Sequence, residues 1–561
     1  MANFLLPLLT TTAELAKENF IKKTRQTLAV QERFLYKILQ AYQDTELGRE
    51  YGLKYIKNIE QFREQVPVLP YSSYEPYVER IAKGQKNILT ADPVVYLNTT
   101  SGSTGKQKMI PVTRRFQNSL GWANLTCIGF LSEALRYRKS KFGKLMVTYS
   151  SKLSGVTSGG IKYGPGGAGV LRMGKLMYEQ LFAHPYQTLK PTDSLSRHYL
   201  CLLFALRQES MRGIAANFPM LILRICNYLQ LYAKDLIEDL ETGEIANWLK
   251  LEPEIRLQLE KIIIPAPARA AKLREIWKSH GRLTPKLAWP DLSYIGTARG
   301  GTSDFYFQRF PDYLDETPVF GSVYASAEGT FSIYHDLDID GSILAIETGF
   351  FEFIPEQEWE AQHPKTLLAN EVKPGNLYRI LVTNYSGFYR YDIGDVVEVL
   401  GFYESTPIIV FRYRRGGLLS STTEKTTEFH VTQVMQTLQQ EFSLSLEDFC
   451  ITLSANEFPA HYLVNIELTP NHSLPNTQAF LLRFDQKLKE INLRYKLKRH
   501  DEVPPPRLRI LAPGSFAILR QRQVQKGIPD SQLKFPHISE DRNFLAGLAV
   551  EQEITLMEDY S

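Results

Sequence analysis

Cysteine is scarce in this chain. The 561 residues include four cysteines, at positions 127, 201, 226 and 450. No Cys-x-x-Cys pair occurs, and no histidine stands near them at the spacing of a zinc site. The pattern therefore predicts buried free thiols in the reducing cytoplasm.

An excess of charge and long apolar runs are also missing. The formal net charge of +4 is small for this length, so we expect no extended surface for nucleic acids or membranes. The one dense basic run, RYKLKRH at 494–500, is expected to be the solvated face of a helix. No stretch approaches the ~20 apolar residues that span a bilayer, and MANFLLPLLTTT has no basic segment typical of a signal peptide. These absences predict a cytoplasmic protein.

Helical and strand-like patterns alternate along the chain, which indicates an α/β fold class. Apolar spacing predicts a helix over 12–44 and further helices through 195–248. Short β-branched runs predict strands at 94–97 and 145–149, and a strand-rich section follows between about 291 and 411. No internal repeat is present, and no heptad pattern predicts an oligomeric state.

A polar, glycine-containing segment, RYRRGGLLSSTTEKTTE, begins at Arg412 and predicts a domain boundary near residue 411. We therefore expect an N-terminal domain of 1–410 and a smaller α/β domain of 411–561 that acts as a lid. Patterns in the second domain predict helices at 430–442 and 481–495 and strands at 449–454, 462–468 and 508–510.

The segment LNTTSGSTGKQKMIPVT has the composition of a phosphate-binding loop. After a strand-like run it gathers hydroxyl side chains around Gly102 and Gly105, with Lys106 and Lys108 behind them. Small residues let backbone N–H groups approach phosphate oxygens, hydroxyls add donors, and lysines offset the charge. The alternative is a flexible surface loop.

Three better-known nucleotide or nucleophile motifs do not fit. Counting back from Gly105 and Lys106 puts Thr100 where a Walker A loop needs glycine, and Gln107 replaces its Mg²⁺-binding hydroxyl. This loop lacks the Gly-x-Gly-x-x-Gly spacing of dinucleotide sites, and no Gly-x-Ser-x-Gly elbow is present to supply a nucleophile. The loop is therefore not that of an ordinary P-loop ATPase or a dinucleotide enzyme.

Two further motifs end predicted strands in turns that carry a carboxylate. They are VYASAEG, with Glu328, and GFYRYDIGDVVEVLGF, with Asp395. Taken singly, Glu328 is typical of a helix cap and Asp395 of a turn beside Gly394. In this order behind the phosphate loop, the two indicate a nucleotide site.

The series TTSGSTGKQK, YASAEG, YRYDIGD and the connector FRYRRGGLLSSTTEKTTE resembles the adenylate-forming superfamily. The residues of these motifs most resemble those of the auxin-responsive Gretchen Hagen family of acyl acid amido synthetases. The segments FREQVPVLPYSSYEPYVERIAKGQ, PGSF and QLKFP resemble other parts of that family, so nearly the whole chain takes part. The resemblance implies a large N-terminal adenylate-forming domain, with mixed β-sheets flanked by helices and a strand-rich section, and a small mobile α/β C-terminal domain.

The resemblance also implies a role for each motif residue. The ATP phosphates would be held by Thr100, Ser101, Ser103 and Thr104, with Lys108 balancing their charge. Glu328 would face Mg²⁺, Tyr324 would lie near the adenine, and Asp395 would accept hydrogen bonds from the ribose. Phe411 and Arg415 would sit at the hinge and would also belong to the nucleotide-binding residues. Lys534 in QLKFP would swing toward the nucleotide, although His537 stands where the family usually has an arginine–cysteine ending. Catalytic roles would fall to Ser101, Lys108, Glu328 and Lys534.

The implied reaction uses ATP and Mg²⁺. A small carboxylic acid would attack the α-phosphorus, pyrophosphate would leave, and the acyl-AMP would pass its acyl group to an amine such as an amino acid. An acid–CoA ligase shares the first half-reaction and stays open as an alternative. A non-catalytic nucleotide-binding protein is a second alternative, and the joint presence of Glu328, Asp395 and Lys534 argues against it.

Two other segments have competing interpretations. The run SGGIKYGPGGAG at 158–169 is expected to be an ordinary loop, with the lining of the acyl pocket as the alternative. In HDLDIDGSILAIE, the acidic residues match a calcium loop position by position. The flanking β-branched and aromatic residues instead predict strands with a hairpin turn at Asp340 and Gly341.

Overall fold

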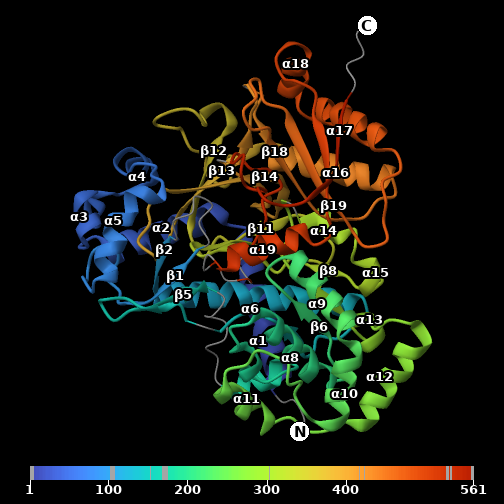
Figure 1. Ribbon diagram of the computed structural model, residues 1–561. Coiled ribbons are helices and arrows are strands. Elements are labelled where there is room, and N and C mark those ends of the chain that lie inside the picture. The colour runs from blue at the N-terminus through green and yellow to red at the C-terminus, as the bar shows by residue number, and fades with distance from the viewer. Residues whose placement is uncertain are drawn as a thin grey trace. The chain divides into compact units, whose positions relative to one another are not determined.

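The computed structural model shows a mixed α/β architecture (Figure 1), which confirms the predicted class. It describes residues 5–100, 108–151, 153–166, 175–301, 303–415, 417–422, 424–525, 528, 530 and 533–556. The chain divides into two compact units, each described by itself below. Unit 1 consists of Met1–Arg299, Phe310–Ile393 and Val397–Phe411, and unit 2 of Gly300–Arg309, Gly394–Val396 and Arg412–Ser561.

Unit 1 begins with two helices, α1 (Leu5–Thr24) and α2 (Thr27–Tyr42), so the prediction of a single helix over 12–44 was wrong. The chain turns after Thr24 because the carbonyl of this residue accepts hydrogen bonds from the hydroxyls of Ser405 and Thr406, at 2.6 and 3.2 Å. These partners lie far along the sequence. The apolar residues that share one face of α2, Phe34, Leu35, Ile38, Leu39 and Tyr42, are buried.

Three sheets build the body of unit 1. The first has the order β2 (Met109–Thr113), β1 (Val94–Thr99), β5 (Lys162–Pro165) and β4 (Gly155–Val156). The second is parallel, with the order β3 (Leu145–Val147), β6 (Gly213–Ala215), β7 (Tyr294–Gly296) and β8 (Val319–Phe320). The third has seven strands, in the order β12 (Phe350–Pro355), β13 (Leu377–Thr383), β14 (Tyr391–Tyr403), β15 (Thr406–Arg414), β11 (Ser342–Leu344), β10 (Gly329–Ile333) and β9 (Val323–Ser326).

Helices connect these strands. Those between the N-terminal pair and the second sheet are α3 (Glu46–Glu50), α4 (Ile59–Gln65), α5 (Tyr71–Ala82), α6 (Arg114–Tyr137), α7 (Lys175–Leu181) and α8 (Ser194–Leu206). The next group is α9 (Pro219–Leu231), α10 (Ala233–Thr242), α11 (Pro253–Glu260), α12 (Pro267–His280), α13 (Pro285–Ala288) and α15 (Pro311–Leu314). The predicted helical section at 195–248 is thus confirmed as α8, α9 and α10.

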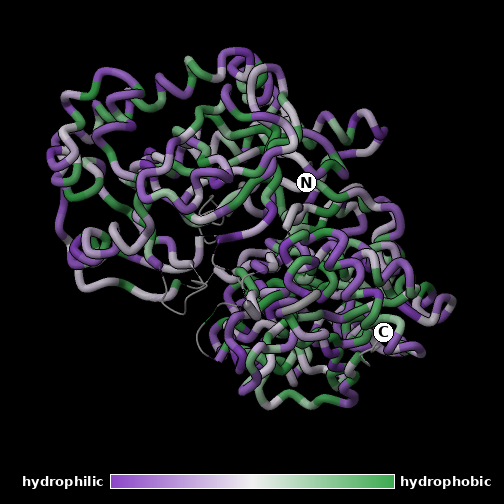
Figure 2. Tube along the Cα trace, turned by 90° about the horizontal axis from the view of Figure 1, so that it is seen from above, coloured by the Kyte–Doolittle hydropathy of each residue, from purple (hydrophilic) through white to green (hydrophobic). Residues whose placement is uncertain are grey.

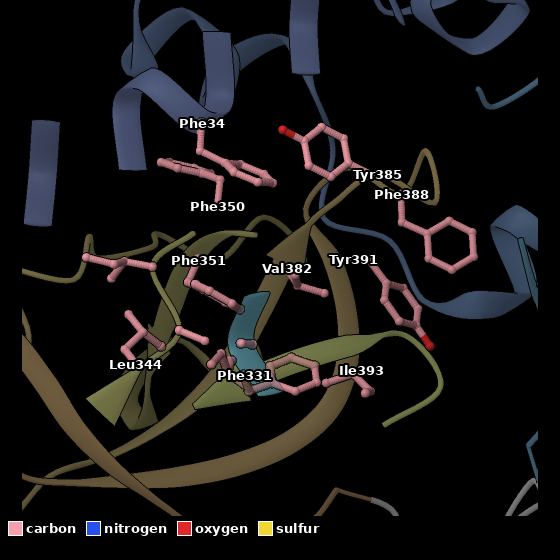
Figure 3. Close-up of a cluster of buried hydrophobic side chains, with 14 of the residues drawn as sticks. Phe34, Phe331, Leu344, Phe350, Phe351, Val382, Tyr385, Phe388, Tyr391 and Ile393 are labelled. Atoms are coloured by element: carbon pink, nitrogen blue, oxygen red, sulfur yellow. The ribbon is translucent and has the colours of Figure 1, made fainter. Parts of the chain in front are cut away.

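The core of unit 1 lies between α2 and the seven-stranded sheet. Gln31 of α2 donates to the carbonyls of Ile346 and Gly349 and accepts from the N–H of Phe351, which ties the helix to β12. Figure 3 shows Phe34 of α2 among the rings of this cluster, and its centroid lies 4.9 Å from that of Tyr385. Hydrophobic and hydrophilic residues alternate along the chain (Figure 2). Among the described residues, no helix combines the length and apolar content needed to cross a bilayer.

Two loop predictions are settled by strand pairing. Lys162–Pro165 forms β5 and pairs in parallel with β1, so the prediction of an ordinary loop was wrong there, while 167–169 lie outside the described residues. The calcium-like segment is flanked by β10 and β11, which pair antiparallel, so the predicted strands are confirmed and the two helices of an EF-hand are not formed. The connection runs from 334 to 341, so it is longer than a two-residue turn.

Unit 2 contains a four-stranded sheet with the order β18 (Leu446–Leu453), β19 (Tyr462–Leu468), β20 (Arg507–Leu511) and β21 (Val550–Thr555). It also holds the short pair β16 (Leu418–Leu419) and β17 (Thr426–Thr427) and the helices α14 (Ser303–Phe307), α16 (Glu428–Glu441), α17 (Thr477–Ile491), α18 (Leu493–Asp501) and α19 (Ser515–Gln525). The single helix predicted over 481–495 is two helices, because Asn492 ends α17 and its side chain caps α18 by accepting from the N–H of Tyr495.

A buried ion pair fixes the start of β14. Arg390 has a positive φ of 44°, which is unfavourable for a residue with a side chain. Its guanidinium binds both carboxylate oxygens of Glu352 at 3.0 Å and donates to the carbonyls of Arg63 and Val66. The side chains are only 6% and 1% exposed. The pair therefore holds a strained residue immediately before Tyr391.

We predict that Glu352→Ala strongly destabilises the protein. The substitution leaves the guanidinium of Arg390 buried without its counter-charge, which typically costs about 3–5 kcal/mol. Glu260→Ala is a matched control, because Glu260 forms an exposed pair with Arg256 in α11 that is worth about 0–1 kcal/mol. Urea denaturation measures both; equal midpoints for the two variants would contradict the role given to the buried pair.

Candidate adenylation site

The phosphate-loop motif lies at the end of the hairpin formed by β1 and β2. The strands pair antiparallel with Thr99 opposite Met109, and the N–H of Thr100 donates to the carbonyl of Lys108 at 3.1 Å. Thr100 and Lys108 are thus brought together as the two ends of the loop. The predicted site residues Ser101, Ser103 and Thr104 lie outside the described residues.

Glu328 occupies the turn between β9 and β10 and is 3% exposed. One carboxylate oxygen accepts a hydrogen bond from the hydroxyl of Ser326 at 2.7 Å, and the other from the hydroxyl of Tyr391 at 3.1 Å. Within the described part of the chain, no lysine, arginine or histidine forms an ion pair with it. A buried carboxylate that is bound only by neutral donors keeps an unbalanced negative charge, which a cation can neutralise.

Two asparagines fix the turn that carries Glu328. Asn384 donates to the carbonyl of Glu328 at 2.6 Å, and Asn98 of β1 donates to the carbonyl of Ala327 at 3.2 Å. The second bond joins the turn directly to the strand that leads into the phosphate loop. The structure therefore brings the phosphate hairpin and Glu328 together, as the order of the motifs predicted.

Tyr324 and Phe411 form a half-buried aromatic surface in unit 1. Their ring centroids are 5.6 Å apart at an interplanar angle of 44°, and Tyr324 stacks on the buried Phe331 at 5.0 Å and 26°. Tyr324 comes from β9, four residues before Glu328, and Phe411 from β15. Two of the predicted nucleotide-binding residues are thus adjacent.

Asp395 lies in the part of β14 that belongs to unit 2. Its side chain is buried, and Nε of Arg414 donates to its Oδ1 at 2.6 Å. The N–H of Arg415 donates to the carbonyl of Gly394, also at 2.6 Å. Asp395 and Arg415, the predicted hinge residue, are therefore held next to each other, within unit 2.

Lys534 is exposed on unit 2, between the buried side chains of Leu533 and Phe535. Three residues further on, His537 is fully buried and stacks on Phe449, with ring centroids 4.0 Å apart. Its Nε2 lies 3.2 Å from a carboxylate oxygen of Asp448. His537, where this sequence departs from the family pattern, thus lies in the core of unit 2. The exposed Lys534 stands three residues earlier, between two buried side chains.

The described residues contain no group of three or more His, Cys, Asp or Glu side chains that could hold a metal ion. Among the described residues, Glu328 offers a buried carboxylate in a turn that Asn98 ties to the hairpin of β1 and β2. That donor set fits Mg²⁺, which is often bound by one or two carboxylates together with the phosphates of a substrate.

Family models cover most of the chain. The GH3 family N-terminal domain matches residues 16–319, the GH3 family central domain 342–414, and the GH3 family C-terminal domain 429–543. This chain belongs to the GH3 family. The resemblance to the Gretchen Hagen family is thereby confirmed.

Relatives of this GH3 chain match over nearly their whole length. Jasmonoyl–L-amino acid synthetase JAR4 of Nicotiana attenuata is 26% identical, with 92% of each chain aligned. Indole-3-acetic acid-amido synthetase GH3.3 of Arabidopsis thaliana is 24% identical, with 91% of this chain and 89% of that protein aligned. The solved structure of AtGH3.15 acyl acid amido synthetase in complex with 2,4-DB matches with a TM-score of 0.87 at 22% identity, over 98% of both chains. The likeness confirms the fold.

Sequence reasoning missed most of the residues that hold the GH3 site in place. Tyr391 and Ser326 lie inside the motifs YRYDIGD and YASAEG, so their proximity to Glu328 had a signal. The same is true of Arg414 in the connector. Asn98 and Asn384 had none, because each binds a backbone carbonyl more than fifty residues away in the sequence.

Proposed function

We propose that this GH3 protein is an ATP-dependent acyl acid amido synthetase. It activates a small carboxylic acid as an acyl-adenylate with release of pyrophosphate, and it transfers the acyl group to an amine, with an amino acid as the proposed acceptor. The observation that carries the proposal is Glu328, a buried carboxylate without a cationic partner in the described residues, tied through Asn98 to the phosphate hairpin.

The proposed chemistry has two displacements. A carboxylate oxygen of the acid bonds to the α-phosphorus of ATP as the bond to pyrophosphate breaks. The amine nitrogen then bonds to the acyl carbon, AMP leaves, and the nitrogen loses a proton. Mg²⁺, when bound, neutralises charge on the phosphates. The task of the protein is to position these groups and stabilise their developing charge.

Within unit 1, we assign the phosphates to Thr100, Ser101, Ser103 and Thr104 with Lys108, and Mg²⁺ to Glu328. The half-buried rings of Tyr324 and Phe411 are tilted to each other, and each offers an apolar face of the kind on which an adenine can stack. The hairpin, the Glu328 turn and this aromatic surface all come from strands, which are rigid supports for a site.

Within unit 2, we assign the ribose hydroxyls to Asp395, because an ionised carboxylate only accepts hydrogen bonds. Arg415 acts at the hinge, and the exposed Lys534 reaches the nucleotide when the lid, proposed as residues 411–561, moves. Relatives named as jasmonoyl–amino acid and indole-3-acetic acid-amido synthetases support a carboxylic acid and an amino acid as the substrates.

Acid-dependent exchange of labelled pyrophosphate into ATP tests the proposal. We expect exchange with some members of a broad panel of carboxylic acids, and an amide product when amino acids are added. A complete lack of exchange across the panel would overturn the enzyme assignment. Exchange followed by a thioester with CoA, and by no amide, would instead favour an acid–CoA ligase.

We predict that Glu328→Gln impairs catalysis without unfolding the protein. The amide keeps the shape of the side chain, and the hydroxyls of Ser326 and Tyr391 can rotate to suit it, but the negative charge is lost. Loss of one charge-stabilising group typically slows such a reaction about 10²–10³-fold. Pyrophosphate exchange measured against Mg²⁺ concentration should show the loss, with Glu260→Gln as an exposed control. If Glu328→Gln depends on Mg²⁺ concentration as the wild type does, Glu328 does not bind Mg²⁺.

Lys534→Ala should lower turnover about 10²-fold while ATP affinity, measured by calorimetry, changes by no more than a few fold. The reason is that an exposed lysine on a mobile unit acts during the reaction and is not needed to hold the nucleotide. Lys496→Ala, at an exposed position in α18, is the control. Equal losses of affinity and turnover would contradict a mobile lid.

A further inference from the structure

Helix α5 places tyrosines at every third position: Tyr71, Tyr74 and Tyr77. The first two make the same unusual contact. The hydroxyl of Tyr71 accepts from the N–H of Met109 and donates to its carbonyl, both at 2.9 Å. The hydroxyl of Tyr74 does the same with Tyr389, at 3.2 and 2.5 Å. Each hydroxyl thus brackets the backbone of a single residue in another segment.

Tyr71 brackets the residue at which the phosphate loop ends. Met109 is the first residue of β2 and directly follows Lys108. The ring of Tyr71 also lies under the side chain of Lys108, whose Nζ is 5.3 Å from the ring centroid. Such cation–π contacts favour a defined position of the ammonium group. Tyr71 therefore fixes both the backbone and the charged group at this end of the loop.

Tyr74 brackets the segment that holds Glu328. Tyr389 lies two residues before Tyr391, whose hydroxyl donates to the carboxylate of Glu328. The ring of Tyr74 packs against those of Phe388 and Tyr391, with centroids 4.7 and 6.0 Å apart. Figure 3 shows Phe388 and Tyr391 next to each other on this segment, with centroids 5.1 Å apart. Tyr74 therefore fixes the position of Tyr391 at the start of β14.

Both hydroxyls are shielded from water. Tyr71 is 8% exposed and Tyr74 is 1% exposed. Burial raises the pKa of Tyr71 to about 12 and raises that of Tyr74 further, so both hydroxyls keep their protons and remain donors at neutral pH. Removing the hydroxyl of Tyr74 leaves the N–H and carbonyl of the buried Tyr389 without that partner, and removing that of Tyr71 does the same at the half-buried Met109. The loss of such partners is costly.

We propose that Tyr71 and Tyr74 are positioning residues for the adenylation reaction, joined by one rigid helix. Tyr71 acts through Met109 and Lys108 on the nucleotide phosphates. Tyr74 acts through Tyr389 and Tyr391 on Glu328 and its cation. Because the two residues are one helical turn apart, α5 holds Lys108 and Met109, at the end of the phosphate-loop motif, in a fixed register with the Glu328 segment. This assignment rests on the proposed function.

Tyrosine-to-phenylalanine variants test the two roles separately, because they remove a hydroxyl and keep the ring. In the pyrophosphate exchange assay, Tyr71→Phe should raise the KM for ATP about five- to thirty-fold and leave the half-saturating Mg²⁺ concentration unchanged. Tyr74→Phe should raise the half-saturating Mg²⁺ concentration by a similar factor. Tyr71→Leu, which also removes the ring under Lys108, should raise the KM more than Tyr71→Phe does.

Tyr77→Phe is the matched control, since Tyr77 lies on the same helix and its hydroxyl donates to the exposed Glu50. It should behave as wild type. Thermal melting of every variant separates positioning from general destabilisation, and the comparison of Tyr71→Phe with Tyr71→Leu remains informative if Tyr74→Phe does not fold.

Three outcomes are distinguishable. Different effects on ATP and Mg²⁺ in the two variants support the proposal. In a second outcome, the wild type is active while Tyr71→Phe and Tyr74→Phe have the same kinetics as Tyr77→Phe, with at most a changed melting temperature. That result would overturn the positioning roles alone. A wild type that shows no exchange with any acid and no calorimetric binding of ATP with Mg²⁺ would overturn these roles together with the proposed function.

Discussion

The carboxylate of Glu328 sits almost entirely out of contact with water, where its negative charge is expensive to keep. Hydroxyl donors from Ser326 and Tyr391 offset this cost, and no lysine, arginine or histidine among the described residues forms an ion pair with the carboxylate. The turn between β9 and β10, the start of β14 and the end of β1 are all fixed in ways that keep this carboxylate in place.

Much of the surrounding structure can be understood as support for that constraint. The buried pair of Arg390 and Glu352 holds a residue of positive φ directly before Tyr391, and Asn98 ties the Glu328 turn to the phosphate hairpin. These contacts lie within unit 1 and make its share of the site rigid. Asp395, Arg415 and Lys534 belong to unit 2, which has its own sheet and its own core around His537.

The sequence predicted the elements whose signals are local. Strand β19 was predicted with its observed bounds, and the structure brings together two pairs of residues, Thr100 with Lys108 and Tyr324 with Phe411, to which the family resemblance assigned roles. Helix ends set by distant partners were not predictable: the break after Thr24 depends on hydroxyls that come from 405–406. The role of the asparagines that fix the Glu328 turn could not be predicted either, because they bind backbone carbonyls and their positions in the sequence follow no spacing rule. Strand β21 carries no apolar alternation strong enough to predict it, since five of its six residues are exposed.

The central claim is that the acid attacks the α-phosphorus of ATP and that AMP is the leaving group of the second step. It is tested most directly with an acid that supports exchange, labelled with ¹⁸O in its carboxylate, followed by mass spectrometry of the nucleotide formed with the amide. The account predicts that AMP carries one ¹⁸O atom from the acid, because the oxygen that bonds to phosphorus stays with it when the acyl–oxygen bond breaks. Label in inorganic phosphate, with unlabelled ADP as the nucleotide, would show attack at the γ-phosphorus and would contradict the account.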